Sequence, residues 1–234
     1  MSVTDEAIAR IKELIVTGQL GPGDRIPREA DLAAQLGLSR SSLREAVRAL
    51  AMIRVLDVRQ GDGTYVSSLE PGPLLESVGF VTELLAGGRL LEIMEVRRLL
   101  ESAATAMAAV SIGDDDLATL AGDIAQMRAA STAEELIEVD ARFHDTIARA
   151  AGNLTLAHLL QGFAGRIHRV RVGHVAVREG GVEVTHRGHD AILSALSGHN
   201  PELARAAALL HVAETESWIR TALVRAEPLG GAEP

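Results

Sequence analysis

The chain has 234 residues, a formal net charge of -9 and no cysteine. This length exceeds what one hydrophobic core usually serves, and the lack of cysteine excludes disulfides and thiolate metal sites, leaving His, Asp and Glu as ligands for a transition metal. The chain opens with polar residues, and charges interrupt every longer apolar stretch, so we expect no signal peptide, no membrane partner and a cytoplasmic location.

Residues 1–69 combine helical patterns with two short β-type runs. A first amphipathic helix is followed by a short helix expected at 29–36 and a longer one that starts at Ser39 and runs to about residue 53. The β-type runs, 55–58 and 64–66, flank a glycine-rich turn. Three helices followed by a hairpin predict a winged helix-turn-helix domain.

The third predicted helix divides into a basic stripe and an apolar stripe. Arg40, Arg44 and Arg48 lie at four-residue intervals. About a third of a turn away lie the apolar residues Leu43, Ala46, Val47 and Leu50. A recognition helix needs this division, because its arginines reach phosphates and guanine edges while the helix stays docked to its domain. Ser39 and Ser41 add hydroxyls at the helix start, where a phosphate is favoured.

The uneven distribution of charge keeps nucleic acid among the expected partners. Residues 1–69 hold nine Lys or Arg and nine Asp or Glu, so the whole net charge of -9 belongs to the rest of the chain. A neutral domain binds DNA through one local basic face. For an isolated helix an arginine stripe is more often a solvated face, but the order of short helix, glycine turn, striped helix and glycine-tipped hairpin favours DNA reading here.

Residues 70–73 break both periodicities and are the expected linker. Beyond them the pattern is helical throughout, which predicts an all-α bundle of about seven helices over residues 74–226, followed by a flexible tail at 227–234. The expected helices are 74–86, 90–110, 114–129, 133–151, 154–176, 183–197 and 201–225. The predicted fold class is therefore mainly α, a winged helix-turn-helix followed by a helical bundle.

Several motifs of the first domain occur in a recognisable order. They are Gly18-x-Leu20-x-Pro22-Gly23-Asp24-x-Ile26-Pro27, Asp31-Leu32-Ala33, Leu36-Gly37-Leu38-Ser39-Arg40, Leu43-Arg44-Glu45-Ala46 and Gly61-x-Gly63-Thr64-x-Val66. This series resembles the DNA-binding domain of the GntR family. The resemblance implies operator contacts from Arg40 and Arg44, and a wing whose Gly61 brings backbone near the minor groove. Gly63 beside it is included among the predicted DNA-binding residues.

The sequence departs from that family pattern at two positions. The family usually has an arginine where Ala30 stands, and Arg28 is the possible substitute. It usually has a glycine where Arg54 stands, which indicates an unusual end to the recognition helix.

Four polar residues fall on inward helix faces of the second domain. Asp140 and His144 are one turn apart on an apolar stripe, while His189 and His211 lie on two later helices among apolar residues. One carboxylate and three imidazoles suit a divalent transition metal, zinc first, with nickel, manganese or iron as alternatives. For any one histidine alone a hydrogen-bonded core position is the more frequent explanation, and spacing alone does not bring three helices together.

A second resemblance bears on these residues. The motifs are Glu95-x-Arg97-x3-Glu101, Asp140-x2-Phe143-His144, Gly152-Asn153, His189-x2-Ile192-Leu193-x-Ala195 and Ala204-x6-His211. They resemble the FCD ligand-binding domain of FadR-type GntR regulators. That resemblance implies a metal held by Asp140, His144, His189 and His211, and a carboxylate effector held by the metal and Arg97. For Arg97 an alternative is a surface pair with Glu101.

Two further residues are predicted to contact the effector. Asn153 belongs to the matched pair, and His186 lies one turn before His189. The resulting hypothesis is a homodimeric regulator, more plausibly a repressor than an activator, that binds a palindromic operator on double-stranded DNA under control of a small carboxylate. The alternatives are a metal-dependent enzyme on the helical domain, or a regulator whose metal is purely structural or is itself the signal.

Overall fold

The computed structural model describes residues 3–72, 74–75, 89–163 and 181–226, with side chains described only for 185–221 of the last range. Contacts divide the chain into two compact units, Met1–Ser77 and Val78–Pro234, which we describe separately. The predicted linker, 70–73, falls inside the first of these units near its end. The predicted tail and most of the predicted helix 74–86 lie outside the described residues.

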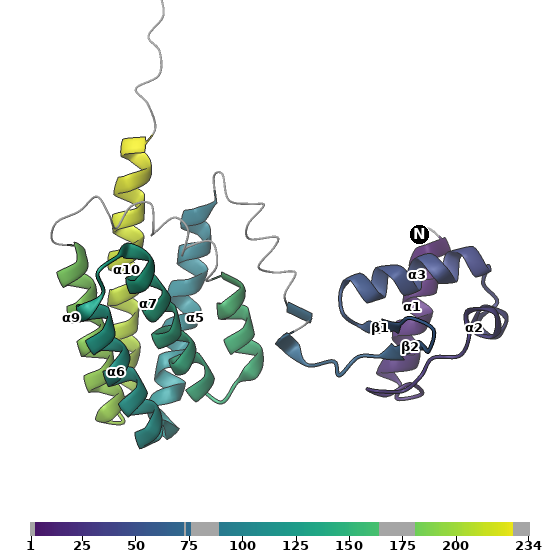
Figure 1. The fold of residues 1–234 in the computed structure, drawn as a ribbon, viewed down its shortest axis with the longest axis horizontal. Coiled ribbons are helices and arrows are strands. Elements are labelled where there is room, and N and C mark those ends of the chain that lie inside the picture. Colours follow the sequence, from purple (N-terminus) through teal and green to yellow (C-terminus); the bar gives the residue numbers. More distant parts are fainter. Residues whose placement is uncertain (1–2, 73, 76–88, 164–180, 227–234) are drawn as a thin grey trace, which may run out of the picture. The chain divides into compact units, whose positions relative to one another are not determined.

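The N-terminal unit has the predicted order of three helices and a two-stranded hairpin (Figure 1). Its elements are α1 (Val3–Val16), α2 (Glu29–Leu36), α3 (Arg40–Met52), β1 (Leu56–Arg59) and β2 (Gly63–Val66). The winged helix-turn-helix prediction is confirmed. Three of the four strand ends differ from the expected ranges by one residue, and the end at Val66 agrees.

The turn between α2 and α3 follows from two local features. Gly37 ends α2 in the left-handed conformation at φ 68°, where its N–H reaches the carbonyls of Ala33 and Ala34. Ser39 then caps α3, because its side-chain oxygen accepts a hydrogen bond from the Ser42 N–H at 3.1 Å. The change of direction between these helices is therefore encoded by residues 37–39.

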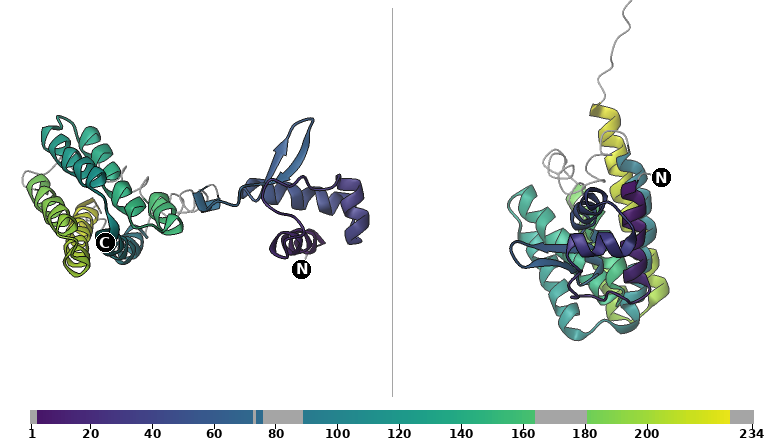
Figure 2. Two further views of the ribbon diagram at one scale, coloured as in Figure 1. Left: turned by 90° about the horizontal axis from the view of Figure 1, so that it is seen from below. Right: turned by 90° about the vertical axis from the view of Figure 1, so that its right-hand side faces the viewer.

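The hairpin is antiparallel, with Leu56 paired to Val66 and Arg59 paired to Gly63. Residues 23–26 add main-chain hydrogen bonds to the outer side of β2, including Ile26 N–H to the Thr64 carbonyl at 2.9 Å. One turned view shows the two strands as a narrow hairpin extending from the helices of this unit (Figure 2). These bonds anchor the wing at its base.

The core of the N-terminal unit joins all three helices to the wing. Its fully buried large side chains are Ile11, Leu32, Leu43 and Leu56. Each such side chain stabilises the fold by about 1.5–3 kcal/mol relative to an exposed position. This packing fixes one face of α3 against the domain and leaves its other face to solvent.

The C-terminal unit is helical, as predicted (Figure 1). Its elements are α5 (Leu90–Ser111), α6 (Asp114–Ala129), α7 (Ala133–Ala150), a helix over 154–163, α9 (Gly181–Ser197) and α10 (Pro201–Ala226). Their bounds agree with the expected ranges to within two residues, except that the predicted segment 154–176 continues into residues outside the described part. A capping box of Thr132 and Glu135 begins α7.

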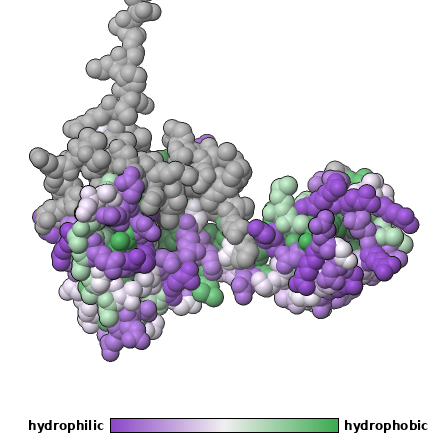
Figure 3. Space-filling view, viewed as in Figure 1, coloured by the Kyte–Doolittle hydropathy of each residue, from purple (hydrophilic) through white to green (hydrophobic). Residues whose placement is uncertain are grey.

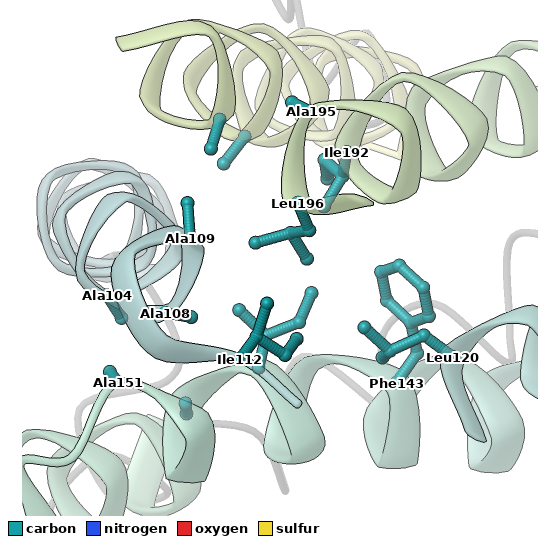
Figure 4. Close-up of a cluster of buried hydrophobic side chains, with 14 of the residues drawn as sticks. Ala104, Ala108, Ala109, Ile112, Leu120, Phe143, Ala151, Ile192, Ala195 and Leu196 are labelled. Carbon is teal, nitrogen blue, oxygen red and sulfur yellow. The ribbon is translucent and has the colours of Figure 1, made fainter. Parts of the chain in front are cut away.

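The interior of the C-terminal unit takes side chains from each of its described helices. Labelled side chains of α5, α6, α7 and α9 point into a shared apolar space, with Phe143 and Leu120 across from Ile192 and Leu196 (Figure 4). Small residues of α5 such as Ala104 and Ala108 allow close packing there. Phe143 lies between Asp140 and His144 in sequence, so the apolar core and two of the four predicted metal ligands share α7.

No helix within the described residues is both long enough and apolar enough to cross a membrane.

Candidate nucleic-acid interface and candidate metal centre

The arginine stripe of α3 faces solvent. Arg40 is exposed, and the side chains of Arg44 and Arg48 are 55% and 69% exposed, while the opposite face of the helix is buried. Hydrophilic residues cover most of the visible surface of this unit (Figure 3). The helix therefore presents three guanidinium groups on the side away from its core, as a groove-reading helix requires.

Two of the three arginines form exposed ion pairs. Arg44 Nε lies 3.0 Å from Glu29 Oε2, and Arg48 Nη1 lies 2.9 Å from Glu45 Oε1. Exposed pairs of this kind contribute about 0–1 kcal/mol, so a phosphate or a guanine edge can displace the carboxylate at low cost. The first of these contacts joins the Arg44 side chain of α3 to Glu29 at the start of α2.

The predicted residues at the two helix starts take different positions. Ser39 has a structural role as the cap of α3, and its hydroxyl lies 2.9 Å from that of the exposed Ser41. Arg28 is exposed and precedes α2 in an extended conformation, at φ -56° and ψ 144°. Arg28 and Arg40 form no hydrogen bond or ion pair with the described residues, so both are available to an anion.

The tip of the wing holds two basic residues that the sequence reading did not select. Arg25 donates a hydrogen bond to the Asp62 carbonyl, and the Arg59 guanidinium lies 4.1 Å from the centre of the Tyr65 ring. A Cβ on Gly63 would come within 2.6 Å of Arg25 Nε, so this glycine makes room for the arginine. Arg59 lies just before the Gly61–Gly63 turn, which was the available signal for it, whereas no local pattern brings Arg25 to this turn.

The end of α3 shows why Arg54 is unusual. Arg54 has a left-handed φ of 63°, directly after the C-cap Ile53. Glycine is favoured at such positions because a Cβ is strained there by about 1–2 kcal/mol. The departure from the GntR pattern at this residue therefore costs stability.

The four predicted metal ligands of the C-terminal unit converge. Asp140, His144, His189 and His211 each offer a ligand atom, and these atoms all lie within 4.8 Å of one another. His189 Nε2 is 3.2 Å from Asp140 Oδ1, and His144 Nε2 is 3.3 Å from His211 Nε2. Residues from α7, α9 and α10, up to 71 positions apart in sequence, thus form one cluster.

The cluster suits a cation because its polar atoms are buried. Asp140, His189 and His211 are 2%, 0% and 3% exposed. The contact of His189 with Asp140 lacks hydrogen-bond geometry, and both ring nitrogens of His189 are buried with no hydrogen-bond partner among the described residues. Such groups cost about 1–3 kcal/mol each when unsatisfied, and a bound divalent ion removes that cost. One carboxylate and three imidazoles are a donor set for zinc and its neighbours.

The environment of His144 favours its neutral form. Burial lowers the pKa of His144 below its ordinary value, which outweighs the opposing effect of the nearby Glu101 and Asp140 carboxylates. A neutral imidazole has a free lone pair, so this shift keeps the ring ready to bind a metal.

Arg97, the predicted effector-binding residue, is buried. It pairs with Glu101 one turn later on α5, with Arg97 Nε 2.5 Å from Glu101 Oε1. The second carboxylate oxygen lies 3.5 Å from His144 Nδ1. The predicted pair with Glu101 is therefore present but buried, so its placement on the surface is wrong. Sequence reasoning treated Glu101 only as a partner for Arg97, whereas the structure also places it beside His144.

The other two predicted effector residues lie in different surroundings. His186 is 7% exposed on α9, one turn before His189. Asn153 is exposed and caps the helix over 154–163, since its Oδ1 accepts a hydrogen bond from the Leu156 N–H at 3.1 Å. A role in effector binding stays a prediction for both, and the capping role accounts for Asn153 without it.

Gly188 allows α9 and α10 to approach each other beside the cluster. A Cβ at this position would lie 2.5 Å from His211 Nδ1 and 3.2 Å from its Cγ. Because both atoms belong to the imidazole ring, the ring itself would have to move. Gly188 is thus a second residue of the site that the histidine pattern alone did not reveal.

Charged contacts tie the ligand-bearing helices to α6. Arg142 of α7 donates to Asp123 of α6 through Nε at 2.9 Å and Nη2 at 2.5 Å, and Asp123 is buried. Arg128 of α6 lies 2.6 Å from Asp190 of α9. The helices that carry Asp140 and His189 are therefore both held by α6.

Comparisons with known proteins identify families for both units. Residues 3–66 match the bacterial regulatory proteins of the gntR family, and residues 92–214 match the FCD domain. The HTH-type transcriptional regulator LutR of Bacillus subtilis (strain 168) is 28% identical over 208 residues, which cover 87% of this chain and 94% of LutR. The galactonate operon transcriptional repressor of Escherichia coli (strain K12) is 26% identical over 219 residues, covering 92% and 96%.

A solved structure gives the same result. Streptococcus agalactiae GntR is 30% identical, with a TM-score of 0.60 over 92% of this chain and 99% of its own. The matched families and relatives are regulators, so the alternative of a metal-dependent enzyme is not supported. The chain belongs to the gntR family of bacterial regulatory proteins and is a DNA-binding transcriptional regulator with a C-terminal FCD domain.

Proposed function

We propose that this regulator is a homodimeric repressor whose operator binding is controlled by a small carboxylate bound at a divalent metal in the C-terminal unit. The observation that carries the proposal is the convergence of Asp140, His144, His189 and His211, with Arg97 joined to them through one carboxylate. Zinc is the first choice of metal, and nickel, manganese and iron remain alternatives.

The DNA-binding residues in this proposal are the exposed ones of the winged helix. Arg40, Arg44 and Arg48 contact the major groove, and Arg28 and Ser41 contact phosphates at the helix starts. The backbone at Gly61 and Gly63 approaches the minor groove. The protein acts in the cytoplasm and joins the nucleoid when the operator is bound.

A carboxylate effector fits the chemistry of the cluster. Four protein ligands leave open positions on a metal that accepts five or six, and carboxylate oxygens are ligands for such ions. The planar guanidinium of Arg97 matches the two oxygens of a carboxylate. The name of the galactonate operon repressor also refers to a hydroxycarboxylate, which supports sugar acids and hydroxy acids as the effector class.

The homodimer is proposed because one winged helix covers too few bases for useful specificity. A twofold dimer places two recognition helices on the half-sites of a palindromic operator. An effector that binds one arrangement of the two heads more tightly than another then shifts the population away from the operator-binding state.

One observation favours a second role for the metal. Three of its four ligands are almost fully buried, as in ions that mainly stabilise a fold. Chelation separates the two roles, because removal of a structural ion unfolds the C-terminal unit while removal of a sensing ion leaves it folded and unresponsive. Fluorescence of Trp218, the chain's single tryptophan, reports on that unit.

The proposal is tested by thermal shift with a panel of sugar acids, hydroxy acids and dicarboxylates, each measured on chelator-stripped and on Zn²⁺-loaded protein. A true effector at about a hundred times its Kd adds nearly 3 kcal/mol of stability, only in the loaded protein. The same compound should release operator DNA in a mobility-shift assay at fixed salt. A panel without any metal-dependent hit would overturn carboxylate sensing.

A further inference from the structure

A single buried carboxylate connects Arg97 to the candidate metal centre. Glu101 on α5 is 7% exposed, and its Oε1 accepts a hydrogen bond from Arg97 Nε at 2.5 Å. Its Oε2 is buried, has no hydrogen-bond partner in the part of the chain that the structure describes, and lies 3.5 Å from His144 Nδ1. One oxygen of this carboxylate is therefore satisfied, and the other lies next to a ring nitrogen of a predicted metal ligand.

The two nitrogens of His144 face different groups. Nε2 is 3.3 Å from His211 Nε2 and 4.0 Å from Asp140 Oδ1, so it belongs to the cluster. Nδ1 faces Glu101. A neutral imidazole carries its hydrogen on one nitrogen and a lone pair on the other, so only the Nδ1–H tautomer directs a lone pair toward the cluster. A carboxylate beside Nδ1 favours that tautomer.

We propose that Glu101 is a positioning residue of the metal centre, which holds His144 as the Nδ1–H tautomer with Nε2 directed at the ion. This inference rests on the metal site of the proposed function. Because the same carboxylate also binds Arg97, the metal ligand and the effector-binding arginine share one hydrogen-bond acceptor. An effector carboxylate that accepts the Arg97 hydrogen bonds in place of Glu101 thereby removes the guanidinium partner of the carboxylate beside His144.

The alternative role for Glu101 is that it serves only as the counter-ion of Arg97. Removing it would leave a guanidinium buried without compensation, which is strongly destabilising and would disturb the cluster indirectly. The double variant Arg97→Met/Glu101→Met removes both charges. It restores metal binding if Glu101 serves only Arg97, and it stays impaired if Glu101 serves His144.

The test is a Zn²⁺ titration of the chelator-stripped full chain. We expect Glu101→Met and the double variant to bind Zn²⁺ about 10–100-fold more weakly than wild type, the usual effect of removing a residue that supports a metal ligand. Glu101→Gln retains an acceptor oxygen and should recover part of the affinity. Glu216→Met is the matched control, since Glu216 is a mostly buried carboxylate on α10 that pairs with Arg98 and Arg220.

A second measurement needs no variant. In ¹⁵N-histidine NMR of the Zn²⁺-loaded wild type, His144 should bind through Nε2 and carry a proton on Nδ1. This readout keeps the proposal falsifiable even if Glu101→Met fails to fold, because the proposal requires the Nδ1–H tautomer in the wild type. Coordination through Nδ1 would overturn the proposal.

The outcomes distinguish this inference from the proposed function. A wild-type protein that takes up no Zn²⁺ overturns the metal site itself. Zn²⁺ uptake by wild type together with unchanged affinity in Glu101→Met, or with full recovery in the double variant, overturns only the role of Glu101.

Discussion

The two candidate sites of this regulator are built in opposite ways. The DNA-reading face is exposed and local, because Arg40, Arg44 and Arg48 lie within nine residues of one helix. The metal centre is buried and non-local, since its ligands come from three helices and its position depends on their packing. Substitutions at the first site should therefore weaken DNA binding without unfolding the protein, whereas substitutions at the second site also disturb the core around it.

The largest effect is expected at the buried site. His189→Ala removes a ligand whose side chain is fully buried, and Zn²⁺ affinity should fall by more than the roughly 10–100-fold that supporting residues contribute. The measurement is Zn²⁺ titration of chelator-stripped protein with a competing chromophoric chelator.

His158→Ala is the matched control for this variant. His158 hydrogen-bonds the Leu154 carbonyl on its own helix and is not part of the cluster. Equal Zn²⁺ affinity in His189→Ala and wild type would remove His189 from the site.

The next effect tests the exposed site. Arg44→Ala should weaken operator binding by about 1–3 kcal/mol, or roughly 5–150-fold, while the free energy of unfolding changes by no more than about 0.5 kcal/mol. Fluorescence anisotropy at two salt concentrations measures the affinity, and loss of a phosphate contact would also lower the salt dependence by about one charge.

The control for Arg44 is Arg10→Ala, which removes an exposed arginine that pairs with Glu6 and Glu13 on α1. If Arg10→Ala and Arg44→Ala reduce operator affinity equally, α3 has no special role and the binding is a general effect of charge.

A smaller effect comes from the backbone beside the metal centre. Gly188→Ala places a methyl group against His211, so we expect about tenfold weaker Zn²⁺ binding in a protein that remains folded. Isothermal titration calorimetry gives the affinity, and Trp218 fluorescence shows that the C-terminal unit is intact.

Gly122→Ala is the matched control, because Gly122 lies inside α6 with open space at its Cβ position. Alanine there should stabilise the unit by about 0.5–1 kcal/mol, as in an ordinary helix interior. The same gain at Gly188 without loss of Zn²⁺ affinity would show that the close approach to His211 has no consequence.

The smallest effect concerns the end of the recognition helix. Arg54→Gly relieves the left-handed strain and should stabilise the N-terminal unit by about 0.5–1 kcal/mol after the greater flexibility of unfolded glycine is subtracted. Urea unfolding followed through Tyr65, the chain's single tyrosine, measures this unit separately. Arg54→Ala keeps a Cβ, so a gain equal to that of glycine would contradict the strain argument.

The sequence predicted the exposed arginine stripe, because helical periodicity alone separates the arginines of α3 from Leu43 and Val47. It also placed Asp140 and His144 on one helix face. It did not establish that His189 and His211 join them, since that depends on how α9 and α10 pack; a family resemblance supplied the expectation. The burial of the Arg97–Glu101 pair and the contact of Gly188 with His211 are likewise consequences of packing between helices, which no local pattern records.

Helix α6 supplies none of the four clustered ligands, yet it braces two helices that do. The buried Asp123 accepts two hydrogen bonds from Arg142, on the side of α7 opposite Asp140 and His144, and Arg128 reaches Asp190 on α9. The position of α6 against α7 and α9 therefore influences the spacing of the four predicted ligands. We therefore expect substitutions in α6 to change the affinity of the proposed metal site even when all four predicted ligands stay in place.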